Sequence, residues 1–358
     1  MNKLKRYQFV ALLITLCFII FSIYLVYDAS SVWAKYKYDD SYFYLKRQFI
    51  YACIAIVCLF IGKKINLYKI KKYNLYFLLF CYVLLILVLI PGIGITKGGS
   101  SSWLGFSFLS FQPSELYKLA LIIFVSNYLS NNFYESNKFK TIIPILISLI
   151  IGGILIMLQP DFGTLVVIGG SIIVMLFLSK LSLTYFIFGG VFVSLLLVLM
   201  IIIEPYRMQR IISFIDPFAD PLGSGFQIIQ SMFAIGPGGL IGEGMNASIQ
   251  KYYYLPEPQT DFIFAIAVEE FGLIGGIIII LMYFLLFYYL YKIATLKNDQ
   301  FNYLLSIGLL SLIVIQVIIN LGVVTGLFPV TGITLPFLSY GGSSLIMLSF
   351  SVGLIIGE

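Results

Sequence analysis

Histidine is absent from all 358 residues of the chain. Its absence excludes Ser-His-Asp and Cys-His nucleophile systems, HExxH zinc sites and imidazole general bases. Charged residues are also scarce, at 11% of the chain, whereas soluble domains carry about a quarter. Any acid–base chemistry must therefore come from one of a small number of carboxylates and amines.

Cysteine is nearly absent too, with four residues that all fall inside apolar runs: Cys17, Cys53, Cys58 and Cys81. In that setting they are expected to be small lipid-facing or core residues and not redox or metal-binding groups. The net charge of +6 is modest and dispersed. It fits lysines that snorkel to a membrane surface better than a nucleic-acid-binding patch, so no nucleic-acid partner is expected.

What the chain has in excess is apolar surface, since 60% of its residues are apolar or aromatic. A soluble fold of this length could not bury so much, so the surrounding solvent must be lipid. The sequence therefore predicts an all-α integral membrane protein that forms a single domain over residues 1–358. Residues 7–27 are uncharged and long enough to span, so we interpret them as the first span and not as a cleavable signal peptide.

Hydropathy divides the chain into about ten transmembrane helices, each needing roughly 20 residues. They are expected at residues 7–27, 45–62, 74–95, 113–130, 141–158, 162–179, 182–203, 271–291, 302–325 and 335–357. The last two divide one uncharged stretch, and the glycines and prolines of residues 326–336 supply the turn between them.

Lysine and arginine set the predicted orientation. With the N-terminus inside, 13 of the 22 basic residues fall in the inner segments, which favours cytoplasmic N- and C-termini. Residues 204–260 then form a large extracytoplasmic loop between helices 7 and 8. Loops this long are usually functional, and this one alternates apolar stretches with Pro/Gly turns, so we expect it to fold back onto the bundle.

Charged residues in or beside lipid need an explanation. At two sites of this chain, a structural and a functional interpretation are both open. Glu115 and Lys118 lie one helical turn apart and form either a stabilising pair or a polar wall of a substrate cavity. Asp161 follows Gln159 and Pro160 at the outer mouth, where it is either a helix N-cap or part of a site.

Asp261 is the candidate that the sequence favours most for chemistry. It follows a Pro-rich turn at the start of a helical segment, ahead of the uncharged residues 271–291, so it lies near the outer interface. An N-cap role would explain it structurally. Its apolar setting, the basic residues of the adjoining loop and the lack of histidine favour a functional carboxylate instead.

The outer side of a membrane offers no nucleotide triphosphate, and the chain has no Walker A motif. An enzyme at this position needs a substrate that arrives already activated, and a lipid pyrophosphate meets that need. No nucleotide cofactor is expected.

Separated motifs along nearly the whole chain carry a family resemblance. They are WLG (103–105), FQPSEL (111–116) with Lys118, QPDFGT (159–164), Tyr206-Arg207 with Arg210, GSGFQ (223–227), GPGG (236–239), LPEPQTDF (255–262), Glu269-Glu270, GVVTG (322–326) and PFLSYGGSS (336–344). In this order they resemble the SEDS family of shape, elongation, division and sporulation proteins. Gln259, where many members have histidine, makes the chain most similar to the SpoVE/FtsW branch.

The resemblance implies a peptidoglycan glycosyltransferase that polymerises lipid II on the outer face of the bacterial cytoplasmic membrane. The family's essential carboxylate matches Asp261, the candidate general base. The implied partners are a class B penicillin-binding protein that cross-links, the undecaprenyl-pyrophosphate-linked glycan, and other divisome or elongasome membrane proteins.

The same motifs supply the expected substrate-binding residues. Lys118, Arg207, Arg210 and Lys251 are the candidate pyrophosphate ligands. The remaining candidates are Trp103, Gln112, Ser114, Glu115, Asp161, Gln227 and Glu269. A divalent cation such as Mg²⁺ or Mn²⁺ could neutralise the pyrophosphate, although the sequence shows no dedicated metal cage.

The chain departs from the family where members usually carry an arginine before Trp103, since residues 100–102 are all serine. Two other functions stay open at this point. One is a lipid II flippase, which should place broken helices and charges near the bilayer midplane. The other is a non-catalytic scaffold that recruits a penicillin-binding protein.

Overall fold

The computed structural model describes residues 3–97, 100–106, 109–132, 139–179, 181–190, 205–252 and 255–357. Its α-helices are α1 (Lys3–Tyr38), α2 (Phe43–Lys64), α3 (Leu67–Leu89), α4 (Pro113–Asn131), α5 (Phe139–Met157), α6 (Phe162–Leu178), α8 (Pro205–Ile215), α9 (Phe226–Ile235), α10 (Ile263–Thr295), α11 (Gln300–Val324) and α12 (Gly342–Ile356). The described part of the chain is mostly helical, as the composition predicts.

Long apolar helices occupy the positions that hydropathy predicts. Six of the described helices are long and apolar enough to cross a membrane, namely α1, α2, α3, α5, α10 and α11. Helices α4, α6 and α12 lie at three more of the predicted spans. Of the seventh span, residues 183–190 are helical and residues 191–203 lie outside the described part. The chain is therefore an all-α membrane protein, and the number of ten spans stays a prediction.

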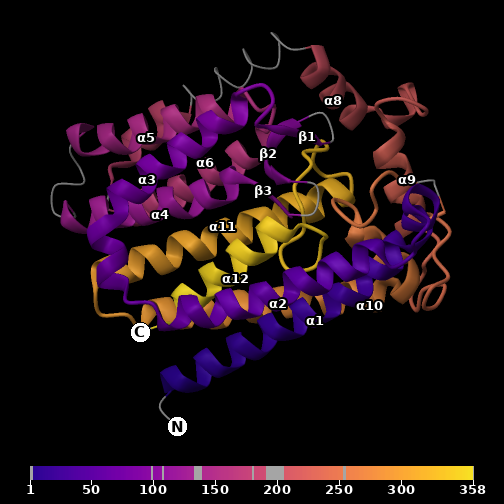
Figure 1. The fold of residues 1–358 in the computed structure, drawn as a ribbon, viewed down its shortest axis with the longest axis horizontal. Coiled ribbons are helices and arrows are strands. Elements are labelled where there is room, and N and C mark those ends of the chain that lie inside the picture. The colour runs from indigo at the N-terminus through magenta and orange to yellow at the C-terminus, as the bar shows by residue number, and fades with distance from the viewer. Residues whose placement is uncertain are drawn as a thin grey trace.

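The two ends of the bundle differ. Both termini lie at one end, while β1 (Ile95–Lys97), β2 (Ser100–Phe106), β3 (Leu109–Phe111), α8 and α9 gather toward the other (Figure 1). The three strands form a small antiparallel sheet in the order β1-β2-β3. This separation fits the expectation that both termini share one side and the long loop lies on the opposite side.

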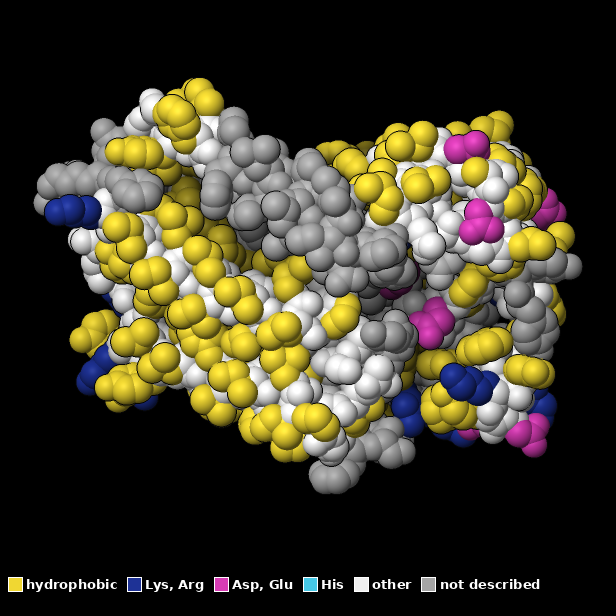
Figure 2. Space-filling model, turned by 90° about the horizontal axis from the view of Figure 1, so that it is seen from above, with side chains coloured by type: hydrophobic (Ala, Val, Ile, Leu, Met, Phe, Trp, Pro, Cys, Tyr) yellow, Lys and Arg dark blue, Asp and Glu magenta, His cyan; other side chains and the backbone are white. Residues whose placement is uncertain are grey.

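A belt of exposed apolar side chains covers the middle of the bundle. The face shown in Figure 2 is largely hydrophobic between its ends, and its visible acidic side chains lie toward the end with α8 and α9. Phe80, Ile150 and Phe284, from three different helices, are each more than half exposed. Apolar exposure on this scale is typical of a surface that faces lipid.

Helix α11 lies at the centre of the bundle and packs against α4, α6, α10 and α12. Most of its residues are buried, including the polar side chains of Gln316 and Asn320. Buried amides need hydrogen-bond partners, because an unpaired polar group costs free energy in an apolar interior. Their partners lie in the segment that follows α11.

The predicted start of the last span, residue 335, is wrong. Residues 335–341 are not helical, and α12 begins only at Gly342. Residues 325–341 form an irregular loop, here called the 325–341 loop, and its residues 335–339 are buried. The Tyr283 hydroxyl donates to the carbonyl of Pro336, and the Ser339 hydroxyl accepts from the Leu335 amide. Hydropathy cannot distinguish a buried apolar loop from a helix, because both are uncharged.

The long outer loop folds back onto the bundle, as predicted. After α8 come a short 3-10 helix (Pro217–Ala219) and α9, which packs against α10 and α11. The Ser231 hydroxyl of α9 donates to the carbonyl of Val324, 2.7 Å away, at the end of α11.

Helix α10 is interrupted at Gly272, and backbone groups of the long loop before it form hydrogen bonds with the groups that the interruption leaves unpaired. Gly272 has φ 68° and ψ −171°, which splits α10 into two parts. The freed carbonyls of Glu269 and Glu270 accept from backbone amides of residues 243 and 244. The freed amides of residues 273 and 274 donate to the carbonyls of residues 239 and 240. Broken helices are tolerated in membrane proteins where other protein groups satisfy the backbone in this way.

Replacing Gly272 with alanine is expected to destabilise the protein. Its positive φ disfavours any side chain, and a Cβ would lie 2.4 Å from the backbone nitrogen of Gly242. We expect a loss of about 1–3 kcal/mol, seen as a lower midpoint of thermal unfolding in detergent. Gly169→Ala in α6 is the matched control, because nothing lies within 4 Å of the added Cβ. Equal midpoints for the two variants would contradict the interpretation.

Candidate active site

Asp261 lies between a turn and the start of α10. The turn is closed by the backbone amide and hydroxyl of Thr260, which both donate to the Glu257 carbonyl. The N-cap of α10 is Phe262, which makes no side-chain capping hydrogen bond. The N-cap explanation of Asp261 is therefore wrong. Asp261 is partly buried, and its carboxylate accepts no hydrogen bond from the described residues.

The 325–341 loop packs directly beside Asp261. A Cβ on Gly332 would lie 3.8 Å from the Asp261 Oδ2 atom. The backbone amide of Tyr340 donates to the Gln259 carbonyl over 2.8 Å, which joins the far end of the loop to the turn before Asp261. Sequence reasoning identified this segment as a family motif and as a turn, but did not place it at the site.

Two charged side chains act on Asp261. The pKa of the Asp261 carboxyl is raised to about 7: burial away from water raises it most, the negative charge of Glu257 also raises it, and the positive charge of Arg210 opposes both. The Arg210 guanidinium donates to the carbonyl of Val330 in the 325–341 loop. A carboxyl that titrates near neutral pH, with a cation nearby, is suited to accept a proton.

A second group of polar side chains lies near the same loop. Asp161 caps α6 by accepting from the Thr164 amide at 3.0 Å and the Thr164 hydroxyl at 2.8 Å. Its Oδ2 atom also accepts from the Gln112 side-chain amide at 3.2 Å. A Cβ on Gly163 would meet Ile333 and the Thr331 carbonyl within 3 Å. Asp161 is thus a helix cap, and it also lies beside the loop that borders Asp261.

Glu115 and Lys118 form a buried ion pair, with 2.8 Å between the Lys118 Nζ and Glu115 Oε1 atoms. The Nζ atom also lies 3.5 Å from the Oε1 atom of Gln316, whose amide donates to the Thr334 carbonyl. The stabilising pair that spacing predicted is present. Its second role, as a wall of a substrate cavity, stays a prediction. The adjacent Ser114 is also buried.

The three-stranded sheet covers the turn that leads to Asp161. The hydroxyls of Ser100 and Ser102 donate to the Gln159 carbonyl at 2.8 and 3.3 Å. Trp103 is partly buried in β2, where it pairs with Ile95 of β1. The serines that stand in place of the usual arginine therefore hold the sheet against the 159–161 turn.

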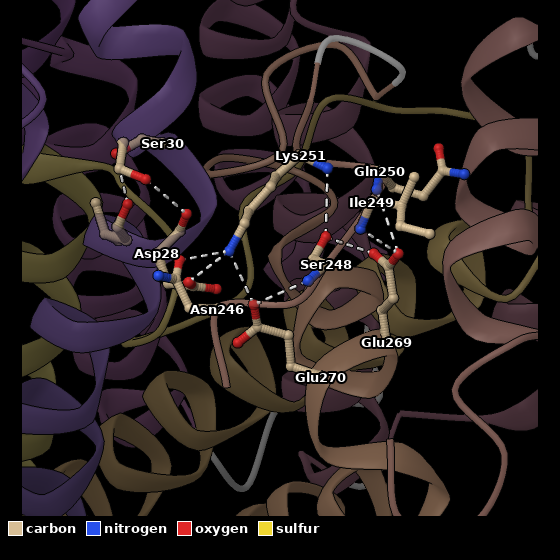
Figure 3. A network of polar contacts seen from close by, with 11 residues as sticks. Asp28, Ser30, Asn246, Ser248, Ile249, Gln250, Lys251, Glu269 and Glu270 are labelled. Atoms are coloured by element: carbon tan, nitrogen blue, oxygen red, sulfur yellow. Dashed lines mark hydrogen bonds and ion pairs between the residues drawn. The ribbon is translucent and has the colours of Figure 1, made fainter. Parts of the chain in front are cut away.

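The ammonium group of Lys251 is buried and contacts side chains of the protein itself (Figure 3). Its Nζ atom lies 2.8 Å from Asp28 Oδ1, 3.0 Å from Glu270 Oε1 and 2.9 Å from Asn246 Oδ1. Burial alone would lower the pKa of Lys251, but the two carboxylates raise it above its ordinary value. Its predicted role as a pyrophosphate ligand is not favoured by this geometry, and we leave Lys251 out of the proposed site.

Glu269 belongs to the same network. It accepts from the Ser248 hydroxyl at 2.5 Å and from the backbone amides of Ile249 and Gln250 at 2.8 and 3.2 Å (Figure 3). Together with Glu270 it fastens the outer loop to the first part of α10. Sequence reasoning missed Asp28, although a carboxylate that ends the first apolar run was a visible signal.

For two of the predicted substrate-binding residues, the structure adds little evidence for or against a binding role. Gln227 is partly buried on α9, and the side chain of Arg207 lies outside the described residues. Among the residues that the structure describes, no three His, Cys, Asp or Glu side chains form a group that could hold a metal ion. The described residues therefore do not fit a dedicated metal centre.

Comparison with known proteins agrees with this arrangement. The model of the FtsW/RodA/SpoVE family, described as cell cycle protein, matches residues 8–357. Stage V sporulation protein E of Bacillus subtilis is 46% identical over 345 residues, which cover 96% of this chain and 94% of the relative. A probable peptidoglycan glycosyltransferase FtsW of Geobacter metallireducens is 39% identical, covering 99% of this chain and 95% of the relative.

Solved structures share the fold. A chain from a peptidoglycan synthase complex, studied for the structural coordination of polymerization and crosslinking, aligns with a TM-score of 0.78 and 28% identity. That alignment covers 98% of this chain and 95% of the other. Rod shape determining protein RodA of Thermus thermophilus aligns with a TM-score of 0.69 at 23% identity, covering 97% of this chain and 94% of RodA. The chain belongs to the FtsW/RodA/SpoVE family of cell cycle proteins.

Proposed function

We propose that this membrane protein is a peptidoglycan glycosyltransferase that polymerises lipid II, with Asp261 as its general base. The observation that carries the proposal is the partly buried Asp261, whose carboxylate accepts no hydrogen bond from the described residues and lies close enough to Arg210 for the positive charge to lower its pKa. Relatives that share nearly the full length of the chain are described as probable peptidoglycan glycosyltransferases.

The reaction joins two lipid-linked saccharides. The 4-hydroxyl of one lipid-linked disaccharide attacks the anomeric carbon of the growing chain, and the bond from that carbon to the undecaprenyl pyrophosphate oxygen breaks with inversion. Asp261 takes the hydroxyl proton as the new glycosidic bond forms. The leaving group departs as an anion, so it needs cations and not a proton donor. A second catalytic carboxylate, of the kind glycosidases use, is therefore not required.

Arg210 is our proposed ligand for the departing pyrophosphate. Its guanidinium is held by the Val330 carbonyl at the edge of the site, and arginine suits bidentate phosphate contacts. Lys118 is a weaker candidate, because Glu115 already neutralises it. Binding roles for Trp103, Gln112, Ser114, Glu115, Asp161, Arg207, Gln227 and Glu269 stay predictions. Mg²⁺ or Mn²⁺, where present, would act as a counter-ion that neutralises the pyrophosphate.

The proposed site lies at the outer face of the bacterial cytoplasmic membrane. Support comes from the excess of basic residues in the predicted inner segments and from the position of α8 and α9 at the end opposite the termini. We propose a class B penicillin-binding protein as the cross-linking partner. The structural likeness to a chain of a complex that coordinates polymerization and crosslinking supports this partner.

The direct test is reconstitution. The purified protein is incubated with lipid II and its penicillin-binding protein, with transpeptidation blocked by a β-lactam, and glycan products are separated by length. We expect polymer to form. If none forms under any divalent-cation condition, the enzyme proposal fails, and transport of lipid II between the leaflets of vesicles becomes the function to measure.

The rate of polymerisation is expected to depend on the ionisation of Asp261. A carboxyl acts as a base only when it is deprotonated, and burial raises its pKa to about 7. A plot of log kcat/KM against pH should therefore rise with a slope of one at acidic pH and level off above about pH 7.

The rising part of this plot, below about pH 7, is here called the acidic limb. Two variants should shift it along the pH axis in opposite directions. Arg210→Gln removes the charge that lowers the Asp261 pKa, so the limb should move to higher pH. Glu257→Gln removes a charge that raises the pKa, so the limb should move to lower pH. Identical limbs in the wild type and both variants would show that another group titrates.

A further inference from the structure

Asn320 of α11 makes two hydrogen bonds that join separate parts of the site. Its Nδ2 atom donates to the backbone carbonyl of Asp261 at 2.8 Å and to that of Ile333 at 2.7 Å. Its side chain is 1% exposed, so water does not compete for these contacts. One amide thus links the candidate base to the 325–341 loop.

The chemistry of the side chain explains why an amide stands here. A side-chain NH₂ group has two hydrogens on one nitrogen, and both are used. The two carbonyls are not paired within a helix or sheet, and buried carbonyls need donors. Leucine and aspartate have nearly the same shape as asparagine, but at neutral pH neither offers a donor. The requirement is therefore for the donors and not for the volume.

The linkage extends to the cation of the site. The same loop carries the Val330 carbonyl, which accepts from Arg210, and Gly332, which borders the Asp261 carboxylate. The carbonyl of Val330, which accepts from Arg210, and the carbonyl of Ile333, which accepts from Asn320, are three positions apart in the sequence. One turn earlier on α11, Gln316 donates to the Thr334 carbonyl at 3.1 Å and fixes the next residue of the loop.

We propose that Asn320 is a positioning residue that sets the Asp261 carboxylate at a fixed place relative to the 325–341 loop and the Arg210 guanidinium. The inference rests on the proposed role of Asp261 as general base. Asn320 touches the backbone of Asp261 and not the reacting atoms, so it acts through Asp261. A base displaced by about 1 Å can lose roughly 100-fold in rate.

The test compares Asn320→Leu, which keeps the shape and loses both donors, with Asn320→Ala, which loses both donors and leaves space. Ser311→Ala is the matched control, since Ser311 is a buried polar residue on the same helix whose hydroxyl donates to the Gly308 carbonyl in its own turn. Each variant is assayed with lipid II for kcat, KM and the pH dependence of kcat/KM, together with its thermal midpoint.

We expect both Asn320 variants to lower kcat by about 10- to 100-fold with KM changed by less than about twofold. The acidic limb should move to higher pH, because the loop no longer holds the Arg210 charge near Asp261. Ser311→Ala should match the wild type in all three kinetic readouts.

A merely structural role would lower the midpoint and the yield but leave kcat per folded molecule and the acidic limb unchanged. That result overturns the proposal, and so does the failure of both variants to fold. Asp261→Asn is assayed in parallel. If the wild type polymerises lipid II and Asp261→Asn does so equally well, the general-base assignment fails first; if only the Asn320 variants behave like the wild type, the positioning role fails alone.

Discussion

Asp261→Asn is expected to reduce lipid II polymerisation by about 10²- to 10⁴-fold, the contribution of a general base. The amide keeps the size of the carboxyl but cannot accept the hydroxyl proton. The fold should survive the change, because the Asp261 carboxylate accepts no hydrogen bond from the described residues and does not cap α10. The measurement is single-turnover and steady-state polymerisation by the purified variant with its penicillin-binding protein.

Asp39→Asn provides a control with the same chemical change. Asp39 is exposed, pairs with Lys35 and has φ 55°, a backbone conformation that asparagine tolerates well. It should polymerise lipid II as the wild type does. The same pair of variants separates the competing functions, since a scaffold would tolerate Asp261→Asn. Full polymerisation by Asp261→Asn would remove Asp261 from the mechanism.

The helices were predictable because hydropathy and helix length are local properties. Nine of the predicted spans have a described helix along them, and residues 183–190 of the remaining one are helical. The break in α10 at Gly272 lies beside residue 271, the predicted start of the eighth span. The position of Asp261, between a turn and the start of a membrane-spanning helix, could be predicted because it too depends on local sequence. Pro256 and Pro258 mark a turn in the sequence, and the uncharged run after it marks the lipid.

The missed features depend on contacts between distant residues. The 325–341 loop is as apolar and uncharged as a span, so its return toward Asp261 cannot be read from hydropathy. The sequence makes Lys251 a candidate pyrophosphate ligand. Its main partner, Asp28, is 223 residues away in the sequence, and only the packing of α1 against α10 brings the two together.

Lys251→Met is expected to destabilise the protein by about 3–5 kcal/mol, the usual cost of removing one partner from a buried ion pair. The side chains of Lys251, Asp28 and Glu270 are each at most 3% exposed. Without the ammonium group, two carboxylates would face each other in an apolar interior with no counter-charge. The measurement is the midpoint of thermal unfolding in detergent, together with the yield of folded protein.

Removing all the charges at once should recover much of this loss. In the triple variant Lys251→Met, Asp28→Asn, Glu270→Gln, no charge of the ion-paired group is left unpaired, and neutral replacements of buried ion pairs are often close to neutral in stability. Lys46→Met is the surface control, because its ion pair with Asp40 is largely exposed and should contribute little. A triple variant as unstable as Lys251→Met alone would show that packing of the lysine stem dominates.

The same series connects stability to catalysis. Lys251, Asp28 and Glu270 join α1 to the first part of α10, and Asp261 lies two residues before that helix begins. If the network acts only on stability, the triple variant should polymerise lipid II at close to the wild-type rate per folded molecule. A folded triple variant with a strongly reduced kcat would instead mean that the Lys251 ion pairs also fix the position of Asp261, from the opposite end of the helical segment that Asn320 holds.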